Sequence, residues 1–133
     1  MTRSGGCMCG AVRYEATGDP EHHALCHCND CRNWSGAPMM GWIAFKDSDV
    51  AVTGTPVTYA SSEHGRREFC GVCGTGLFYR NAEMLPGIID IQSGTLDAPE
   101  ADPAGAEIMV KERLPWMDDL SGLPKFQSYP GLD

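Results

Sequence analysis

The stretch Cys70-Gly71-Val72-Cys73-Gly74 has the composition of a zinc knuckle, and it decides how the chain folds. Two cysteines with two residues between them can converge on one ion through a tight turn, which Gly71 and Gly74 permit. A tetrahedral Zn2+ needs further ligands from a second turn. Cys7-x-Cys9 is such a turn far away in the sequence, so a shared ion would pin the start of the chain to its middle. We expect this to be a structural site.

The other cysteines form the group Cys26-x-Cys28-x2-Cys31, and the chain has seven cysteines in all. Four thiolates close one tetrahedral site, so the remaining three make a site that is one ligand short. A zinc ion with three protein ligands and an open position is typical of reactive or substrate-binding sites. The count therefore predicts two Zn2+ per chain, one of them structural and the other open to a ligand.

Disulfide bonds and iron–sulfur clusters fit this pattern less well. Seven is an odd number, and two of the three groups are too tightly spaced for easy internal bridging. No apolar signal segment follows Met1, so we expect a cytoplasmic protein whose thiols stay reduced. The spacings also differ from the four-cysteine patterns of ferredoxins.

Length and composition indicate one zinc-binding domain over residues 1–133. The chain is 42% hydrophobic and contains 16 glycines and 9 prolines, which predicts a small, loop-rich core that zinc would help to stabilise. Its formal net charge of -8, made more negative by thiolates, disfavours nucleic acid as a partner. No stretch approaches the roughly 20 apolar residues of a membrane span.

Short alternating segments predict a mainly β fold. Residues 12–16 alternate apolar and polar side chains directly after the first cysteine pair, and residues 39–45 form an apolar run typical of a central strand. Residues 29–34 predict one or two helical turns closed by Gly36. Further strands are expected over residues 50–53, 57–60, 66–70, 77–79, 88–92 and 107–112, separated by glycines and prolines.

Three cysteine motifs follow one another along the chain, each with distinctive neighbours. They are Gly5-Gly6-Cys7-x-Cys9-Gly10-x-Val12-Arg13-Tyr14, Cys26-His27-Cys28-x2-Cys31-Arg32-x3-Gly36 and Phe69-Cys70-x2-Cys73-Gly74. Leu114-Pro115-Trp116 comes later, followed by Gly122-Leu123-Pro124-x-Phe126. Over nearly the whole chain the pattern resembles the glutathione-dependent formaldehyde-activating enzyme family, which includes the centromere protein V type.

The resemblance implies a β-tent fold of twisted antiparallel sheets with zinc knuckles. It also implies a structural zinc held by four cysteines and a second zinc held by three. The first set is Cys7, Cys9, Cys70 and Cys73, and the second is Cys26, Cys28 and Cys31. The implied activity is that of a carbon–sulfur lyase resembling S-(hydroxymethyl)glutathione synthase, with a small-molecule thiol and an aldehyde as partners.

The chemistry of an open three-cysteine zinc agrees with that activity. Such an ion lowers the pKa of a bound thiol, so that a thiolate nucleophile exists at neutral pH. Attack by the thiolate of glutathione, as cosubstrate, on formaldehyde or a related small aldehyde would give an S-hydroxymethyl adduct. Thiols also add to formaldehyde unaided, so the alternative hypothesis is a non-catalytic, zinc-stabilised carrier or interaction domain.

Several other polar residues are candidates for the site. His27 would donate a proton to the product oxygen or complete the zinc coordination, unless its position in the turn directs it away. Arg32, Arg66 and Arg67 would pair with the carboxylates of glutathione, or else balance local acidic charge.

We expect His22 and His23, after Pro20, on the surface. Trp34 and Trp42 are expected in the core, unless they line the ligand site. His64 and Glu63 are expected in a solvated loop, unless that loop lines the mouth of the site.

Overall fold

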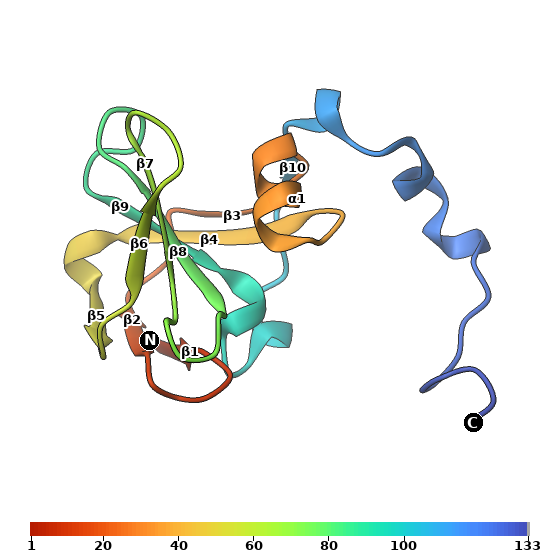
Figure 1. The fold of residues 1–133 in the computed structure, drawn as a ribbon, viewed down its shortest axis with the longest axis horizontal. Coiled ribbons are helices and arrows are strands. Elements are labelled where there is room, and N and C mark those ends of the chain that lie inside the picture. The colour runs from red at the N-terminus through yellow and green to blue at the C-terminus, as the bar shows by residue number, and fades with distance from the viewer. Residues whose placement is uncertain (133) are drawn as a thin grey trace.

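The structure is a computed structural model that describes residues 1–132, and its architecture is mainly β (Figure 1). Within these residues, ten strands form two sheets. A single α-helix assigned in this part of the chain, α1 (Asn29–Ser35), packs beside the larger sheet. The strands are β1 (Thr2–Gly6), β2 (Arg13–Thr17), β3 (His22–Cys26), β4 (Met40–Lys46), β5 (Val50–Thr53), β6 (Val57–Ala60), β7 (Gly65–Phe69), β8 (Gly76–Asn81), β9 (Ile88–Gln92) and β10 (Ala106–Ile108).

The two sheets differ in size. The smaller has the order β1-β2-β5, and the larger has the order β10-β3-β4-β9-β8-β7-β6. Among the pairs described, β10 runs parallel to β3 and the others are antiparallel. The expected mainly β fold of antiparallel sheets is therefore confirmed, with one parallel pair added at the edge of the larger sheet.

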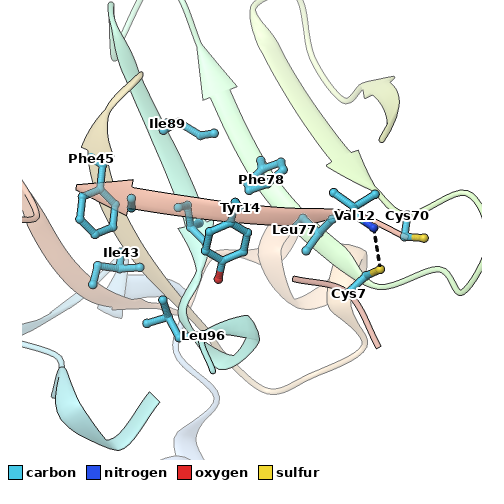
Figure 2. Packing of buried hydrophobic residues seen from close by; sticks show 12 residues of the cluster. Cys7, Val12, Tyr14, Ile43, Phe45, Cys70, Leu77, Phe78, Ile89 and Leu96 are labelled. Atoms are coloured by element: carbon cyan, nitrogen blue, oxygen red, sulfur yellow. Dashed lines mark hydrogen bonds between the residues drawn. The ribbon is translucent and has the colours of Figure 1, made fainter. Parts of the chain in front are cut away.

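The main core lies between the sheets, where alternate residues of the strands face one another (Figure 2). Ile43 and Phe45 of β4 pair in register with Ile91 and Ile89 of β9, and all four are fully buried. Because side chains alternate along a strand, the intervening residues of β4 and β9 lie on the opposite face of the larger sheet. The larger sheet thus has one face for the core and one face free for a site.

The smaller sheet is anchored in this core by Tyr14 of β2. Its ring meets Phe78 edge-on, with 5.6 Å between the centroids, and its hydroxyl lies 2.8 Å from the hydroxyl of Thr95. A Cβ atom at Gly5 of β1 would collide with the Tyr14 hydroxyl and the carbonyl of Thr95. Gly5 is therefore required for the close approach of β1 to this ring.

Most of the expected elements are found, and the exceptions have local causes. The strands expected at residues 50–53, 57–60 and 88–92 are β5, β6 and β9, and α1 ends at Gly36, whose φ of 70° is left-handed. The expected strand at residues 107–112 is wrong in its second half. Met109 has a φ of 54°, which ends β10, and Val110–Glu112 form a 3-10 turn.

Two strands, β1 and β3, were not expected. The sequence of β1 is Thr-Arg-Ser-Gly-Gly, which has no apolar alternation, and β1 forms because it pairs with β2 along its whole length. The expectation that His23 lies on the surface is wrong, because both of its ring nitrogens are buried in β3.

Beyond β10 the chain extends away from the sheets as an arm (Figure 1). None of the helices described over residues 1–132 has the length and apolar character needed to cross a bilayer.

Candidate metal centres and the cavity beside them

Four cysteines from distant parts of the chain meet between the two sheets. The sulfurs of Cys7, Cys9, Cys70 and Cys73 all lie within 4.8 Å of one another. Cys7 and Cys9 are 3.6 Å apart, and Cys9 and Cys70 are 3.8 Å apart. A tetrahedral zinc with Zn–S bonds of about 2.3 Å needs sulfurs about 3.8 Å apart. The donor set and its spacing therefore fit one Zn2+.

Backbone turns supply hydrogen bonds to these sulfurs. The Val12 amide donates to Cys7 Sγ at 3.2 Å, as Figure 2 shows, and the Val72 amide donates to Cys70 Sγ at 3.4 Å. Hydrogen bonds from Thr75 lower the pKa of Cys73 to about 5, which favours its thiolate form. The turn after β1 and the turn after β7 thus present thiolates to one point, joining the smaller sheet to the larger one.

The second group of cysteines lies where β3 passes into α1. The sulfurs of Cys26, Cys28 and Cys31 lie within 4.8 Å of one another, and Cys26 and Cys31 are 3.5 Å apart. Cys28 is the N-cap of α1, and its sulfur accepts a hydrogen bond from the Cys31 amide. The hydrogen bond between Cys31 and Cys26 lowers the pKa of Cys31 to about 5 and raises that of Cys26. No fourth His, Cys, Asp or Glu joins this group within residues 1–132.

A cavity of about 550 Å3 opens beside the three cysteines. Its volume falls within the range of roughly 300 to 1,000 Å3 that is usual for small-molecule sites. Its lining combines the three thiols with aromatic, apolar and charged side chains. The lining residues are His22, Cys26, Cys28, Asn29, Asp30, Cys31, Trp42, Arg67, Tyr79, Met84, Leu85, Asp90, Ile108, Met109 and Glu112.

The floor of this cavity is a row of side chains that crosses the larger sheet. The row takes one residue from each of β7, β8, β9, β4 and β3, paired in register as neighbours. Paired residues of neighbouring strands point to the same face, so these five share the face opposite the core. In order, they are Arg67, Tyr79, Asp90, Ala44 and His22, and all but Ala44 line the cavity.

Two members of the floor row carry buried charge. The guanidinium of Arg67 lies 4.9 Å from the centroid of Tyr79 and 5.9 Å from that of Trp34, and its Nη1 has no hydrogen-bond partner within residues 1–132. Asp90 is 6% exposed, and its Oδ1 also lacks a partner in this part of the chain. Burial raises the pKa of Asp90 to about 6. The His22 ring lies 3.6 Å away.

The three candidate arginines lie in different places. Arg67 lines the cavity, as described. Arg32 lies outside the lining and donates to the carbonyls of His27 and Glu112, at 2.9 and 2.7 Å. Arg66 donates to carbonyls of its own hairpin, including those of Ser62 and Gly65. Arg32 and Arg66 thus satisfy backbone groups, and a role for them in binding glutathione stays a prediction.

His27 is fully buried beneath the cysteine turn. Its Nε2 lies 2.8 Å from Oε1 of Glu107 on β10, and the residue is not among those that line the cavity. The contact ties the turn to the edge strand. Its proposed role as a proton donor stays a prediction.

Asp90 and Tyr79 were not singled out from the sequence as site residues, and His22 was expected only at the surface, where its side chain is 45% exposed. The available signal was Asp90, a charged residue within the otherwise apolar run Ile88-Ile89-Asp90-Ile91. Trp42 is 5% exposed, as expected for a core residue, and it also lines the cavity. Trp34 lines a separate cavity of about 540 Å3 together with Tyr59 and Phe69.

The chain is similar to known proteins. The chain matches the family described as glutathione-dependent formaldehyde-activating enzyme over residues 2–112. An uncharacterized lyase of Schizosaccharomyces pombe is 33% identical over 104 residues, which are 71% of this chain and 74% of that protein. A crystal structure of a Rhodobacter sphaeroides protein has a similar fold, with a TM-score of 0.62 and 18% identity over 78% of this chain and 98% of that one.

Proposed function

Because this chain belongs to the glutathione-dependent formaldehyde-activating enzyme family, we propose that it is a carbon–sulfur lyase-type enzyme that joins a thiol to a small aldehyde. The thiol is that of glutathione, and the aldehyde is formaldehyde or a close relative. The observation that carries the proposal is the position of Cys26, Cys28 and Cys31, three converging thiols in the wall of a cavity of ligand size. The similarity to a protein named as a lyase supports the same reaction class.

Each cysteine group is proposed to hold one Zn2+. The ion held by Cys26, Cys28 and Cys31 would supply an open coordination position, at which a thiol loses its proton near neutral pH. The four-cysteine set would hold a closed, structural ion. Each group contains a thiol with a lowered pKa, Cys31 or Cys73, whereas the pKa values of Cys26, Cys28 and Cys9 are raised, so these thiols would lose their protons on metal binding.

In the proposed reaction, the sulfur of glutathione forms a bond to the aldehyde carbon. The π electrons of the carbonyl move to its oxygen, and the proton lost by the thiol ends on that oxygen, so no oxidant or further reactant is needed. The residues of the chain position the reactants. Trp42 and Tyr79 give the cavity apolar walls that limit water, and Arg67 offers its guanidinium to a carboxylate of glutathione.

Exchange spectroscopy by NMR tests whether the protein turns over. We expect zinc-loaded protein to accelerate exchange between formaldehyde, glutathione and S-hydroxymethylglutathione beyond the spontaneous rate. The Cys28→Ser variant is the matched control, because serine keeps the N-cap of α1 while removing one thiolate. Equal exchange rates with wild-type protein, with the variant and without protein would overturn the enzyme hypothesis and favour a carrier.

Calorimetry tests the contact between the thiol and the metal. Glutathione should bind much more tightly than S-methylglutathione, because methylation removes the thiolate and leaves both carboxylates. Equal affinities would mean that the sulfur does not contact the three-cysteine site.

A further inference from the structure

The floor of the cavity holds two buried groups of opposite charge, each with one polar atom that makes no hydrogen bond within residues 1–132. Arg67 and Asp90 are each 6% exposed, and Arg67 Nη1 and Asp90 Oδ1 have no hydrogen bond within residues 1–132. Burial of a charge is costly, and buried polar groups in proteins are almost always paired. Two orphaned groups in one cavity therefore indicate a ligand that carries both complementary charges.

The geometry of the sheet explains why these two groups do not neutralise each other. Tyr79 stands between them in the floor row, so the backbones of Arg67 and Asp90 are two strand spacings, or about 10 Å, apart. The Arg67 guanidinium rests over the Tyr79 ring, 4.9 Å from its centroid. It is therefore held over Tyr79, the neighbour of Asp90 in the row, where a small group can bridge it to Asp90.

The protein itself gives Asp90 little compensation. The ionisable groups around it are His22 on β3, Tyr79 on β8, Arg67 on β7 and Cys31 on α1. Its sheet neighbour on β4 is Ala44, which carries no charge. His22 is the nearest base, but its side chain is 45% exposed and its nitrogen is 3.6 Å away, too far for a hydrogen bond.

We propose that Arg67 and Asp90 form a subsite for an α-amino-acid group on the thiol cosubstrate, with Arg67 binding its carboxylate and Asp90 its ammonium. The inference rests on the proposed function, because it places this subsite in the cavity that also contains the three thiols. A planar guanidinium matches a carboxylate, and a carboxylate oxygen accepts hydrogen bonds from an ammonium group. An α-amino-acid group carries both charges on one carbon, which matches two sites that flank one aromatic ring.

Two natural thiols carry a free α-amino-acid group. The γ-glutamyl end of glutathione has a free α-ammonium and α-carboxylate, and so does free cysteine. The burial of Asp90 supports the subsite, because an ammonium group would supply the hydrogen bond that its Oδ1 lacks within residues 1–132. Of the two sources we expect glutathione to be preferred, because the cavity of about 550 Å3 greatly exceeds the size of a single amino acid.

Binding of three probes to the zinc-loaded full chain tests the subsite. The probes are glutathione, glutathione acetylated on its α-nitrogen, and free cysteine. Acetylation keeps the thiol and both carboxylates but removes the ammonium. We expect it to weaken binding to wild-type protein by about 10-fold to 100-fold, as is typical for loss of a charged hydrogen bond.

Two variants test whether Asp90 causes the difference in affinity between glutathione and its acetylated form. Asp90→Asn should bind both forms of glutathione with nearly equal affinity, because the amide has no charge to offer an ammonium. Asp97→Asn is the matched control, since Asp97 carries the same charge but lies at the surface in an ion pair with Arg13. It should discriminate as wild type does. Zinc content and circular dichroism establish that both variants are folded and loaded.

Each outcome bears on a different claim. Equal binding of the two forms of glutathione by wild-type protein would overturn the subsite and leave the proposed reaction untouched. Discrimination that survives in Asp90→Asn would also overturn it. Failure of glutathione to bind, with Asp90-dependent binding of cysteine, would support the subsite and overturn glutathione as the cosubstrate.

Discussion

Substitution of Cys73 by serine should destabilise the protein far more than substitution of Cys28. The two positions make a matched pair for this comparison. Cys73 is exposed, so its replacement leaves no cavity in the core, whereas Cys70 is 1% exposed and would confound the measurement. Serine at position 28 preserves the N-cap that the Cys28 sulfur provides to α1. The difference between the variants then reports the metal sites.

The magnitude follows from the loops that each ion would close. Cys9 and Cys70 are 61 residues apart in sequence, whereas Cys26 and Cys31 are 5 apart. The entropy of loop closure grows as 3/2 RT times the logarithm of loop length, so the longer loop is worth about 2 kcal/mol more. For a domain of this size, that corresponds to roughly 8 °C in melting temperature.

Thermal melts followed by circular dichroism measure the effect on zinc-loaded wild-type protein and on both variants, each dialysed free of unbound zinc. Zinc content should be determined on the same samples, so that each melting temperature refers to a known metal load. We expect Cys73→Ser to melt lowest and Cys28→Ser to stay close to wild type. If Cys28→Ser melts as low as Cys73→Ser, the three-cysteine group is structural, and the argument for an open site fails.

Three further predictions concern metal content, packing and pH. Elemental analysis of reduced protein should find two zinc ions per chain, and a value of one or none in carefully purified protein would contradict the assignment of four plus three ligands. Gly5→Ala should destabilise the protein by about 1 to 3 kcal/mol in urea titrations, because its Cβ would collide with Tyr14, whereas Gly94→Ala meets nothing within 4 Å and should be nearly neutral. Asp90 has its pKa raised from 3.8 to about 6, so the folded state resists its ionisation and the contribution of Asp90 to stability should fall as pH rises from about 4 to 6. Asp90→Asn should remove that fall and be more stable at pH 7, by up to roughly 3 kcal/mol, and a variant less stable than wild type at pH 7 would contradict the origin of the shift.

The cysteine groups and many strands were predictable because their signals are local. A metal-binding turn shows its ligands within a few residues, and β5, β6 and β9 are short runs bounded by turn residues. The position of Gly36 likewise gave the end of α1. These features depend on neighbouring residues in sequence, which a single chain displays directly.

The features that were missed depend on partners elsewhere in the fold. β1 has no pattern of its own and exists because β2 pairs with it. The floor of the cavity depends on the register between five strands. The local sequence does not indicate which residues of different strands will pair with one another. Arg67 was therefore proposed together with Arg32 and Arg66, although only Arg67 is directed into the cavity.

The floor row also determines how such a site can change during evolution. Insertion or deletion of one residue inside any of these strands would turn its cavity-facing side chains toward the core. The lengths of the strands are therefore constrained even at positions where the residue type is not. Substitution is different, because exchange of one side chain in the row alters the ligand that fits without moving the turn that holds Cys26, Cys28 and Cys31. In the proposed site, the residues that carry the chemistry and those that select the ligand thus lie on separate parts of the chain, so that ligand preference can change while the three thiols stay in place.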